Sequence, residues 1–253
     1  LINKLETLSD NQRVRIIVVA PTFELASQIN SECKSITKHK SALLIGGAPI
    51  KRQIEVLKEK PEIIIGTAAR LVELIRLKKL KTDGLFAIVF DETDRLVKKE
   101  ALEDTSALRE LLPVGCQIIA CTATINKQTK IFFADAKNLV MPAEDVLKKR
   151  ISHWAIYAET RDKIDALRKF LHAEKPSKAL IFTSRADQVE NIYQKLRYKK
   201  IECECIHAKT DKQKRKSTMD RFRSGKVSIL VTSDLGARGL DIPDISHIIQ
   251  MDL

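Results

Sequence analysis

The residues most capable of chemistry are two adjacent carboxylates that follow a strongly apolar run. The run Phe86–Phe90 leads directly into Asp91 and Glu92 and, one residue later, Asp94. Adjacent ionised carboxylates repel each other unless a cation or a proton compensates their charge. In a site that hydrolyses a nucleotide, the first carboxylate holds Mg²⁺ and the second polarises the attacking water. Taken alone, the motif also fits a turn at the end of a strand with solvated acidic side chains.

Alternating strands and helices are expected to position these residues. Short β-branched runs recur between longer amphipathic stretches, which is typical of parallel sheets covered by helices. Apolar residues at helical spacing, such as Ile164, Leu167 and Leu171, predict a stripe that faces a sheet. We expect strands at Val14–Ala20, Leu43–Ile45, Ile63–Ile65, Phe86–Phe90, Gln117–Cys121, Trp154–Tyr157, Ala179–Thr183, Cys203–Ile206, Ile229–Thr232 and His247–Gln250.

The length and the patterning indicate two domains. A chain of 253 residues with 44% apolar content can fill two modest cores. The strand and helix pattern breaks at Met141 and gives way to a charged stretch that ends at Arg150. We predict a first domain at residues 1–145, a linker at 146–152 and a second domain at 153–253. Ligands of such sheets bind beyond the carboxyl ends of the strands, so polar residues just after each apolar run are the site candidates.

The charge balance favours a polyanionic partner. The formal net charge of +12 is shared by both predicted domains, as in proteins that bind nucleic acid, although many basic proteins bind no anion. No apolar run approaches the roughly 20 residues that span a bilayer. Residues 1–15 are polar and lack the features of a signal peptide. We therefore predict a cytoplasmic protein with no membrane contact.

The cysteines, histidines and aromatic residues indicate structural roles. Five cysteines, at positions 33, 116, 121, 203 and 205, form no Cys-x-x-Cys pair and are predicted to be buried reduced thiols. The five histidines show no ligand spacing, and His207 is given no catalytic role. Trp154 and Tyr157 lie at strand spacing, which favours packing in a core over a platform for stacking bases.

Seven short motifs follow the apolar runs in a fixed order. They are Ala20–Ala26, Gly46–Gly47, Thr67–Arg70, Asp91–Asp94, Thr122–Thr124, Ile181–Thr183 and Ser233–Asp241. Each is weak alone, but their order and separations leave little room for coincidence. The series resembles the DEAD-box ATP-dependent RNA helicases, which share the superfamily-two helicase core, over essentially the whole chain. Asp91–Asp94 resembles the DEAD motif with threonine in place of alanine, and Ala237–Pro243 is the most specific string.

The resemblance implies an α/β fold of two tandem RecA-like lobes, each a mostly parallel sheet covered by helices. It implies an RNA-stimulated ATPase that uses ATP and Mg²⁺, grips the RNA backbone without reading its sequence and separates short duplexes as the lobes close and reopen. It implies catalytic roles for Asp91, Glu92, Asp94, Thr122 and Thr124, with Mg²⁺ on Asp91 and the two threonines linking Asp94 to the second lobe. It further implies ATP contacts from Gly239 and Asp241, and RNA contacts from Pro21, Thr22, Gly47, Thr67, Arg70, Arg215, Ser233 and Asp234.

Several of these residues also have plainer interpretations. Asp241 can be a turn residue before Pro243, and the hydroxyls of Thr122 and Thr124 can satisfy local backbone groups at the end of a strand. The basic stretch at residues 209–226, which contains Arg215, can be a solvated helix face.

The chain departs from the family's pattern in several places. It contains no G-x-x-x-x-G-K-[ST] loop, and we interpret it as truncated before the phosphate loop and before motif VI, the family's late arginine motif. We therefore expect this chain to be nearly inactive and the intact parent to be active, because both motifs stabilise charge in the transition state. Phe23, Ala68, Ala69 and Lys212 replace family residues in the RNA-contacting motifs, which puts the grip on RNA in question.

Two other functions are compatible with the sequence. One is an RNA-binding scaffold that kept the two lobes and lost hydrolysis. The other is a DNA-directed translocase of the same superfamily, which the Asp91–Asp94 and Ala237–Pro243 strings disfavour. A grip on the nucleic-acid backbone carries no base code, so the sequence does not identify the RNA.

Overall fold

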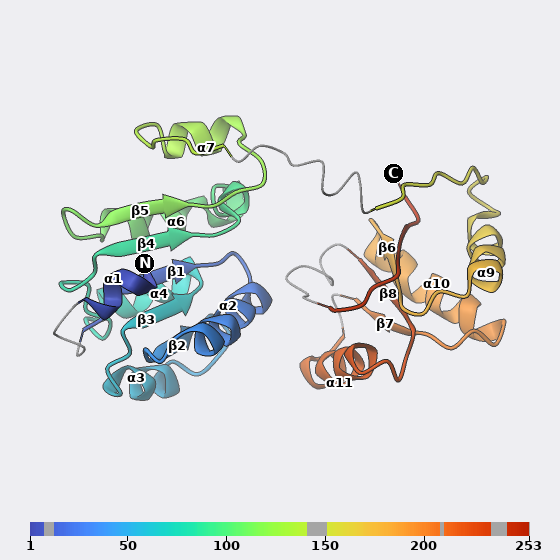
Figure 1. Ribbon diagram of the computed structural model, residues 1–253, viewed down its shortest axis with the longest axis horizontal. Helices are drawn as coiled ribbons and strands as arrows, with labels where there is room; N and C mark the ends of the chain where they lie inside the picture. The colour runs from blue at the N-terminus through green and yellow to red at the C-terminus, as the bar shows by residue number, and fades with distance from the viewer. Residues whose placement is uncertain (8–12, 141–150, 208–209, 234–241, 253) are drawn as a thin grey trace. The chain divides into compact units, whose positions relative to one another are not determined.

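The chain divides into two compact units, Leu1–Asn138 and Leu139–Leu253. The computed structural model describes residues 1–7, 13–140, 151–207, 210–233 and 242–252 (Figure 1). The predicted linker at 146–152 lies largely outside the described residues, so the predicted domain boundaries stay a prediction. Each unit is described by itself below.

The first unit is built on a five-stranded parallel sheet. Its order is β2-β3-β1-β4-β5, and every neighbouring pair is parallel. The strands are β1 (Ile16–Val19), β2 (Ser41–Leu44), β3 (Ile63–Gly66), β4 (Ala87–Phe90) and β5 (Gln117–Ala120). Central strands such as β3 are buried along their whole length, because helices cover both faces of the sheet.

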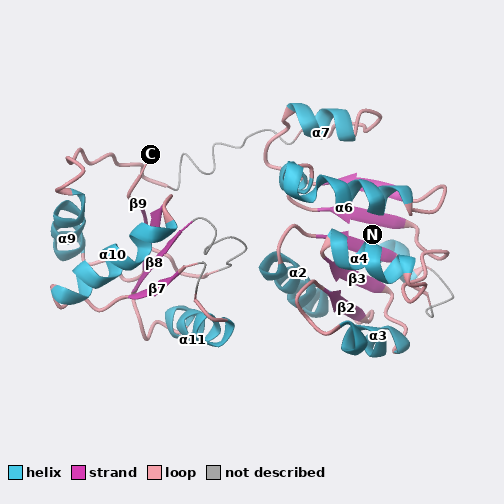
Figure 2. Cartoon of the chain, turned by 180° about the vertical axis from the view of Figure 1, so that it is seen from behind, coloured by secondary structure: helices cyan, strands magenta, loops and turns pink. Residues whose placement is uncertain are grey.

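Helices of the first unit pack on opposite faces of this sheet. They are α1 (Ile2–Glu6), α2 (Phe23–Ile36), α3 (Ile50–Lys58), α4 (Ala68–Arg76), α5 (Thr93–Leu96), α6 (Lys99–Glu110) and α7 (Lys127–Phe132). Alternate strand residues divide between two cores: Ile17 and Ile64 pack with α3, α4 and α6, whereas Ile16 and Ile63 pack with α1 and α2. Figure 2 shows α4 and α6 on the face seen from behind, and Figure 1 shows α2 on the other.

The second unit repeats this architecture on a smaller scale. Its four-stranded parallel sheet has the order β7-β8-β6-β9. The strands are β6 (Ala179–Thr183), β7 (Glu204–Ile206), β8 (Ile229–Ser233) and β9 (His247–Gln250). Helices α9 (Lys163–Glu174) and α10 (Ala186–Tyr198) pack on one face, and α11 (Lys212–Arg223) packs on the other through Met219 and Phe222. The predicted fold class, two parallel sheets with covering helices, is confirmed.

One predicted strand is wrong. Residues 151–158 form neither helix nor strand, and Trp154 and Tyr157 are 81% and 94% exposed, so they do not pack in a core. Alternating side chains become buried on one face only when the segment joins a sheet. This segment joins none of the described strands, and the described sheet of the second unit has β9 as its edge strand next to β6. The alternative role of these aromatics, a platform for bases, is compatible with their exposure.

The prediction for the cysteines holds only in part. All five thiols are free, but only Cys203 and Cys205 are buried. Cys121 is exposed, because it follows β5, an edge strand whose residues are themselves mostly exposed. Among the described helices, none has the length and apolar character needed to cross a membrane.

Candidate nucleotide and RNA site

The register of the first sheet brings the motif residues to one edge. Val19 lies beside Gly66 on one side and Phe90 on the other, and the row continues to Leu44 and Ala120. The strands are parallel and end level, so the residues that follow them share the carboxyl edge of the sheet. Five of the sequence motifs meet there, although their first and last residues are about a hundred positions apart along the chain.

The acidic pair forms a tight turn immediately after β4. The Asp91 backbone N–H donates to Val19 O (2.9 Å), and Asp91 Oδ1 accepts from the Glu92 backbone N–H (2.9 Å). Glu92 has φ 46° and ψ 51°, the left-handed conformation, which is uncommon for a residue other than glycine. Strained backbone of this kind gathers at functional sites, because the surrounding structure must hold it.

The two carboxylates fit a hard cation. Both side chains are half-buried, and Glu92 Oε2 forms an ion pair with Arg95 Nη1 at 2.8 Å. Oxygen donors on adjacent residues are the ligands that Mg²⁺ prefers, and a partly exposed ion pair is worth little, so Arg95 does not lock Glu92. Cys121 lies near this carboxylate pair. Partial desolvation of its thiol, and to a smaller extent the charge of Asp91, raise the pKa of Cys121.

Thr93 ties the turn to the next strand. Its side chain is fully buried, and Thr93 Oγ1 lies 2.9 Å from Phe90 O and 3.0 Å from Cys121 O, with one proton to share between them. The Thr93 backbone N–H also donates to Cys121 O (3.0 Å). The residue that distinguishes this motif from DEAD therefore braces the end of β4 against the end of β5.

Asp94 is held by two threonine hydroxyls. Thr124 Oγ1 donates to Asp94 Oδ2 (3.0 Å), and Thr122 Oγ1 lies 3.2 Å from Asp94 Oδ1. The Thr122 hydroxyl has one proton and also lies 2.8 Å from Thr124 O, so it divides its donation between the two acceptors. The structure thus brings together three residues that the resemblance had associated. Within the first unit the link joins the turn after β4 to the segment after β5.

The glycine pair after β2 lies in a loop fixed from three sides. Gly47 has φ 74°, which glycine adopts at little cost. The Gly46 N–H donates to Thr67 Oγ1 (3.3 Å), so Thr67 supports this loop. Gln53 Oε1 accepts from the Ile45 N–H (3.1 Å), and Gln53 Nε2 donates to Ile45 O (2.9 Å). The buried side-chain amide of Gln53 therefore bonds the backbone N–H and C=O of Ile45, as a neighbouring strand would.

Arg70 supplies the third support. Its Nη1 donates to Ala48 O (3.0 Å), its Nε donates to Glu73 Oε2 (2.8 Å), and its side chain is only 9% exposed. A guanidinium engaged in this way presents little surface to a ligand. The geometry gives Arg70 a structural role in the loop, and its predicted contact with RNA stays a prediction.

Pro21 and Thr22 lie at the start of α2. Thr22 is the N-cap residue, and its Oγ1 accepts from the Leu25 backbone N–H (3.2 Å). Capping uses the acceptor capacity of the hydroxyl and leaves its proton for another partner. Phe23, at the first helical position, is 37% exposed where the family's pattern has arginine.

In the second unit the strand ends form a polar cluster around Asp252. Asp252 Oδ2 accepts from Thr183 Oγ1 (2.7 Å), the Ser184 backbone N–H (3.1 Å) and Ser184 Oγ (3.2 Å). Lys163 Nζ lies 3.6 Å from Asp252 Oδ1. The hydrogen bond from Thr183, followed by those from Ser184, lowers the pKa of Asp252.

The remaining predicted residues of the second unit are only partly described. Ser233 ends β8 beside Thr183, is buried, and its Oγ has no hydrogen-bond partner among the described residues. Arg215 is half-buried in the first turn of α11, whose N-cap Asp211 accepts from the Lys214 N–H (2.9 Å). Asp234, Gly239 and Asp241 lie outside the described residues.

Sequence reasoning missed two residues that organise these edges. Gln53 occupies the apolar stripe of α3 formed by Ile50, Ile54 and Leu57, and a polar residue on such a stripe is a signal that a buried hydrogen bond awaits it. Asp252 follows β9 as Asp91 follows β4, so the rule that polar residues after strands form sites could have found it.

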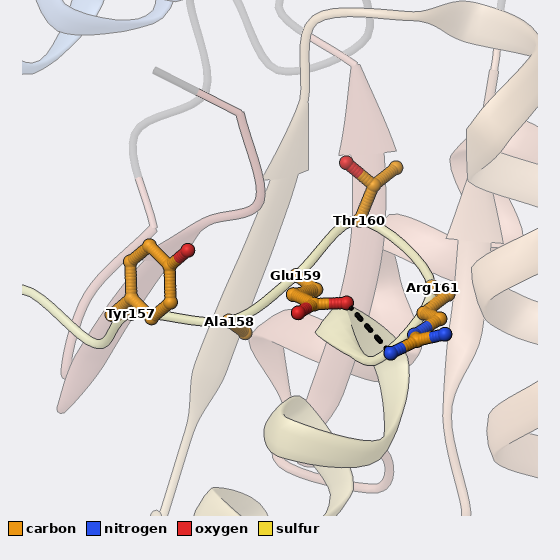
Figure 3. Close-up of a pocket in the computed structure, with 5 residues that line it drawn as sticks. All are labelled: Tyr157, Ala158, Glu159, Thr160 and Arg161. Atoms are coloured by element: carbon orange, nitrogen blue, oxygen red, sulfur yellow. Dashed lines mark ion pairs between the residues drawn. The ribbon is translucent and has the colours of Figure 1, made fainter.

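A shallow pocket lies elsewhere in the second unit. Figure 3 shows its lining, which runs from Tyr157 to Arg161 and includes an ion pair between Glu159 Oε2 and Arg161 Nη2 at 2.9 Å. None of the candidate site residues lines it, and its side chains other than Ala158 are exposed.

With this geometry established, comparison with known proteins identifies the class. The family profile described as DEAD/DEAH box helicase matches residues 1–132, and the helicase conserved C-terminal domain matches residues 162–253. The chain belongs to the DEAD-box helicase family.

Curated relatives of the chain include bacterial RNA helicases. The chain is 36% identical to the DEAD-box ATP-dependent RNA helicase CshC of Bacillus cereus over 245 residues, which cover 94% of this chain and 63% of that protein. It is 30% identical to CshA of Bacillus cereus, over 100% of this chain and 49% of that protein. The chain thus spans about half to two thirds of the length of these curated relatives.

Solved structures share the fold. The Mss116p structure bound to single-stranded RNA and AMP-PNP has a TM-score of 0.73 at 21% identity, covering 99% of this chain and 56% of that one. The S. cerevisiae Dbp5 structure bound to RNA and ADP BeF3 has a TM-score of 0.72 at 22% identity, covering 98% of this chain and 65% of that one. These likenesses confirm the two RecA-like lobes.

Proposed function

We propose that these residues form the core of an RNA-stimulated ATPase that unwinds short RNA duplexes. The observation that carries the proposal is the bridge from Asp94 to Thr122 and Thr124, at 3.2 and 3.0 Å. These hydrogen bonds connect the acidic turn after β4 to the segment after β5, so a movement of one segment displaces the other. Membership of the DEAD-box family and the RNA-bound state of structures with this fold support the same function.

The carboxylates divide the chemistry in the proposed mechanism. Asp91 would hold Mg²⁺, which when bound supplies a Lewis acid that polarises phosphoryl oxygens. Glu92 orients the attacking water and accepts its proton, which requires it to leave Arg95. That ion pair is partly exposed and costs little to break. The left-handed turn fixes the backbone of Glu92 before a ligand binds, so binding costs less conformational entropy.

We propose RNA contacts from residues of both units. In the first unit, Thr22, Gly47 and Thr67 offer backbone N–H groups and hydroxyls to phosphates and sugars, and Pro21, which has no backbone N–H, offers its ring to a sugar. Arg70 contributes by holding the glycine loop. In the second unit, we propose contacts from Arg215, Ser233 and Asp234, and ATP contacts from Gly239 and Asp241. Phosphate contacts carry no sequence information, so RNA of many sequences is expected to bind.

The experiment measures ATP turnover, with and without single-stranded RNA, in the whole protein that carries these residues. RNA-stimulated turnover that is lost in Glu92→Gln supports the proposal. Thr122→Val removes a hydroxyl hydrogen bond to a charged group, worth about 1.5–3 kcal/mol, so we expect roughly a 10- to 100-fold loss of stimulated activity. Thr122→Ser keeps the hydroxyl and serves as the matched control.

Two outcomes would favour the other functions. Tight RNA binding with no turnover, and no effect of Glu92→Gln, identifies a non-hydrolysing RNA-binding scaffold. Equal stimulation by DNA and RNA of the same length identifies a DNA-directed translocase. For the 253-residue chain itself, which contains no G-x-x-x-x-G-K-[ST] motif, we propose turnover far below that of the whole protein.

A further inference from the structure

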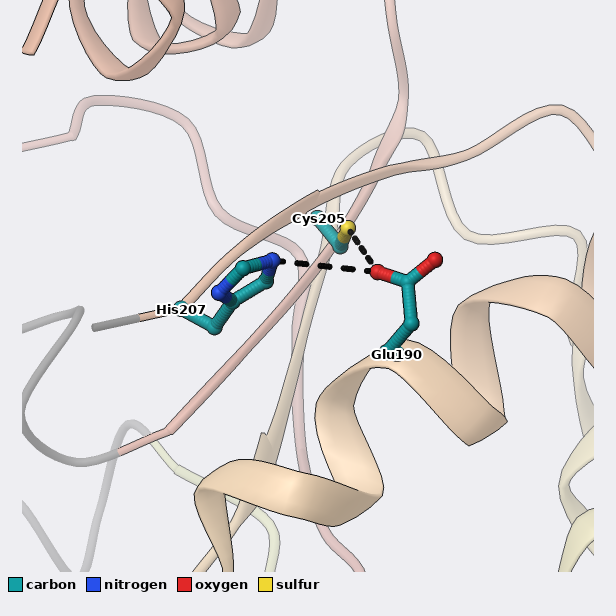
Figure 4. A group of neighbouring side chains, drawn as sticks. All are labelled: Glu190, Cys205 and His207. Carbon is teal, nitrogen blue, oxygen red and sulfur yellow. Dashed lines mark hydrogen bonds and ion pairs between the residues drawn. The ribbon is translucent and has the colours of Figure 1, made fainter. Parts of the chain in front are cut away.

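Three potential metal ligands converge in the second unit, and none of them is among the residues proposed to contact ATP or RNA. Cys205 lies on β7, His207 directly follows β7, and Glu190 projects from α10, which packs against β7 (Figure 4). Their ligand atoms all lie within 4.8 Å of one another. This cluster was not predicted, because Glu190 is fifteen positions from Cys205 and the spacing alone shows no metal motif.

The distances resemble those around a tetrahedral ion. Cys205 Sγ is 3.5 Å from Glu190 Oε2, and His207 Nε2 is 3.8 Å from the same oxygen. Zinc bonds of about 2.3 Å to sulfur and about 2.0 Å to nitrogen or oxygen, at tetrahedral angles, separate ligand atoms by roughly 3.3–3.6 Å. The separation of Cys205 Sγ from Glu190 Oε2 already matches this range. Small side-chain rotations would bring His207 Nε2 to the same separation from the other two ligand atoms. The Glu190 side chain is 50% exposed, and its Oε1 accepts from Gln194 Nε2 (2.6 Å), which leaves Oε2 to face the other two ligands.

The surroundings favour one kind of cation. Cys205 is fixed in the core with Val189, Ile192 and Val231, so its thiol is held in place by packing. The His207 backbone N–H donates to Thr210 Oγ1 (3.0 Å), which fixes the backbone that presents the imidazole. Sulfur, imidazole nitrogen and one carboxylate together suit zinc and similar borderline transition metals, whereas Mg²⁺ prefers oxygen alone.

We propose that Glu190, Cys205 and His207 bind one Zn²⁺ or chemically similar divalent transition-metal ion, with water completing the coordination shell. On binding, the Cys205 thiol releases its proton to the solvent, and the resulting thiolate bonds to the metal. The site anchors β7 to α10 at the start of the segment that leads to α11.

The test titrates the metal-free 253-residue chain with Co²⁺ and Zn²⁺ alone. We expect a near-ultraviolet thiolate-to-cobalt charge-transfer band that saturates at one equivalent and is bleached by Zn²⁺. Cys205→Ser should abolish the band, and His207→Ala and Glu190→Gln should each weaken affinity at least tenfold. The Glu190 side chain is partly exposed, so Glu190→Gln should keep the fold. This variant therefore tests the site even if Cys205→Ser, a substitution at a buried position, destabilises the second unit.

Two thiols outside the cluster supply matched controls. Cys203→Ser changes a buried thiol two positions away, and Cys121→Ser changes the exposed one. Both variants should keep the band, the stoichiometry and the affinity. No saturable band in the parent chain, a band that survives Cys205→Ser, or one that disappears in either control would overturn the proposal.

Discussion

The support of the glycine loop by Gln53 gives a prediction whose size follows from the structure. Gln53→Leu keeps the volume and the apolar stripe of α3 but removes the amide that pairs with Ile45 N–H and O at 3.1 and 2.9 Å. No other described residue bonds these two backbone groups, and both residues are buried. The variant therefore leaves one donor and one acceptor unsatisfied.

The expected cost is about 2 kcal/mol. Each orphaned buried group costs about 1–3 kcal/mol. Burying a leucine side chain in place of the amide returns roughly 1.5–3 kcal/mol. Two orphaned groups less this gain leave a net loss of about 2 kcal/mol of unfolding free energy. At a denaturant slope of about 2 kcal/mol/M, the urea midpoint of the first unit should fall by roughly 1 M.

The assay follows urea unfolding of the 253-residue chain by far-ultraviolet circular dichroism. Arg52→Leu is the matched control, because it places the same residue on an exposed position of the same helix and should change stability by no more than about 0.5 kcal/mol. The unfolding of the second unit should be unchanged in both variants. If Gln53→Leu and Arg52→Leu unfold at the same urea concentration, the hydrogen bonds do not support the loop and the reasoning fails.

Three further predictions concern backbone strain, acid stability and thiol reactivity. Gly47→Ala should cost about 1–2 kcal/mol, because φ is 74°, whereas Gly46→Ala, which has open space and no such φ, should cost less; urea unfolding compares them. The pKa of Asp252 is lowered on folding, so its contribution is present above the unfolded pKa of about 3.9 and is lost as pH falls through the folded pKa. Asp252→Asn should therefore weaken the second unit at neutral pH and flatten its loss of stability below pH ~4, as acid titration with circular dichroism would show. Burial raises the pKa of Cys205 to about 12 in the metal-free chain, so at pH 8 iodoacetamide followed by peptide mass spectrometry should find the exposed Cys121 modified well before it; equal rates would contradict this order.

The sequence by itself determined the layout of the fold and the position of the chemistry. Short apolar runs separated by amphipathic stretches predict parallel sheets. Helices cover both faces of such a sheet, so its strands are apolar throughout and do not alternate between apolar and polar residues. In such sheets, the residue after each strand lies at the ligand-binding edge. Asp91 and Thr122 could therefore be placed from the pattern and the family resemblance, and the structure holds both at that edge.

Only the tertiary structure decided which side chains work together. Gln53 pairs with Ile45, and Arg70 turns inward to Ala48, because strand register and helix packing bring these groups together. The same packing gathers Glu190 around Cys205, which linear spacing does not show. The pattern also misassigned Trp154–Tyr157 as a strand, since a strand exists only where a neighbour supplies its hydrogen bonds. Sequence patterns fix periodicity and chain order, whereas contacts between distant residues depend on how the elements pack.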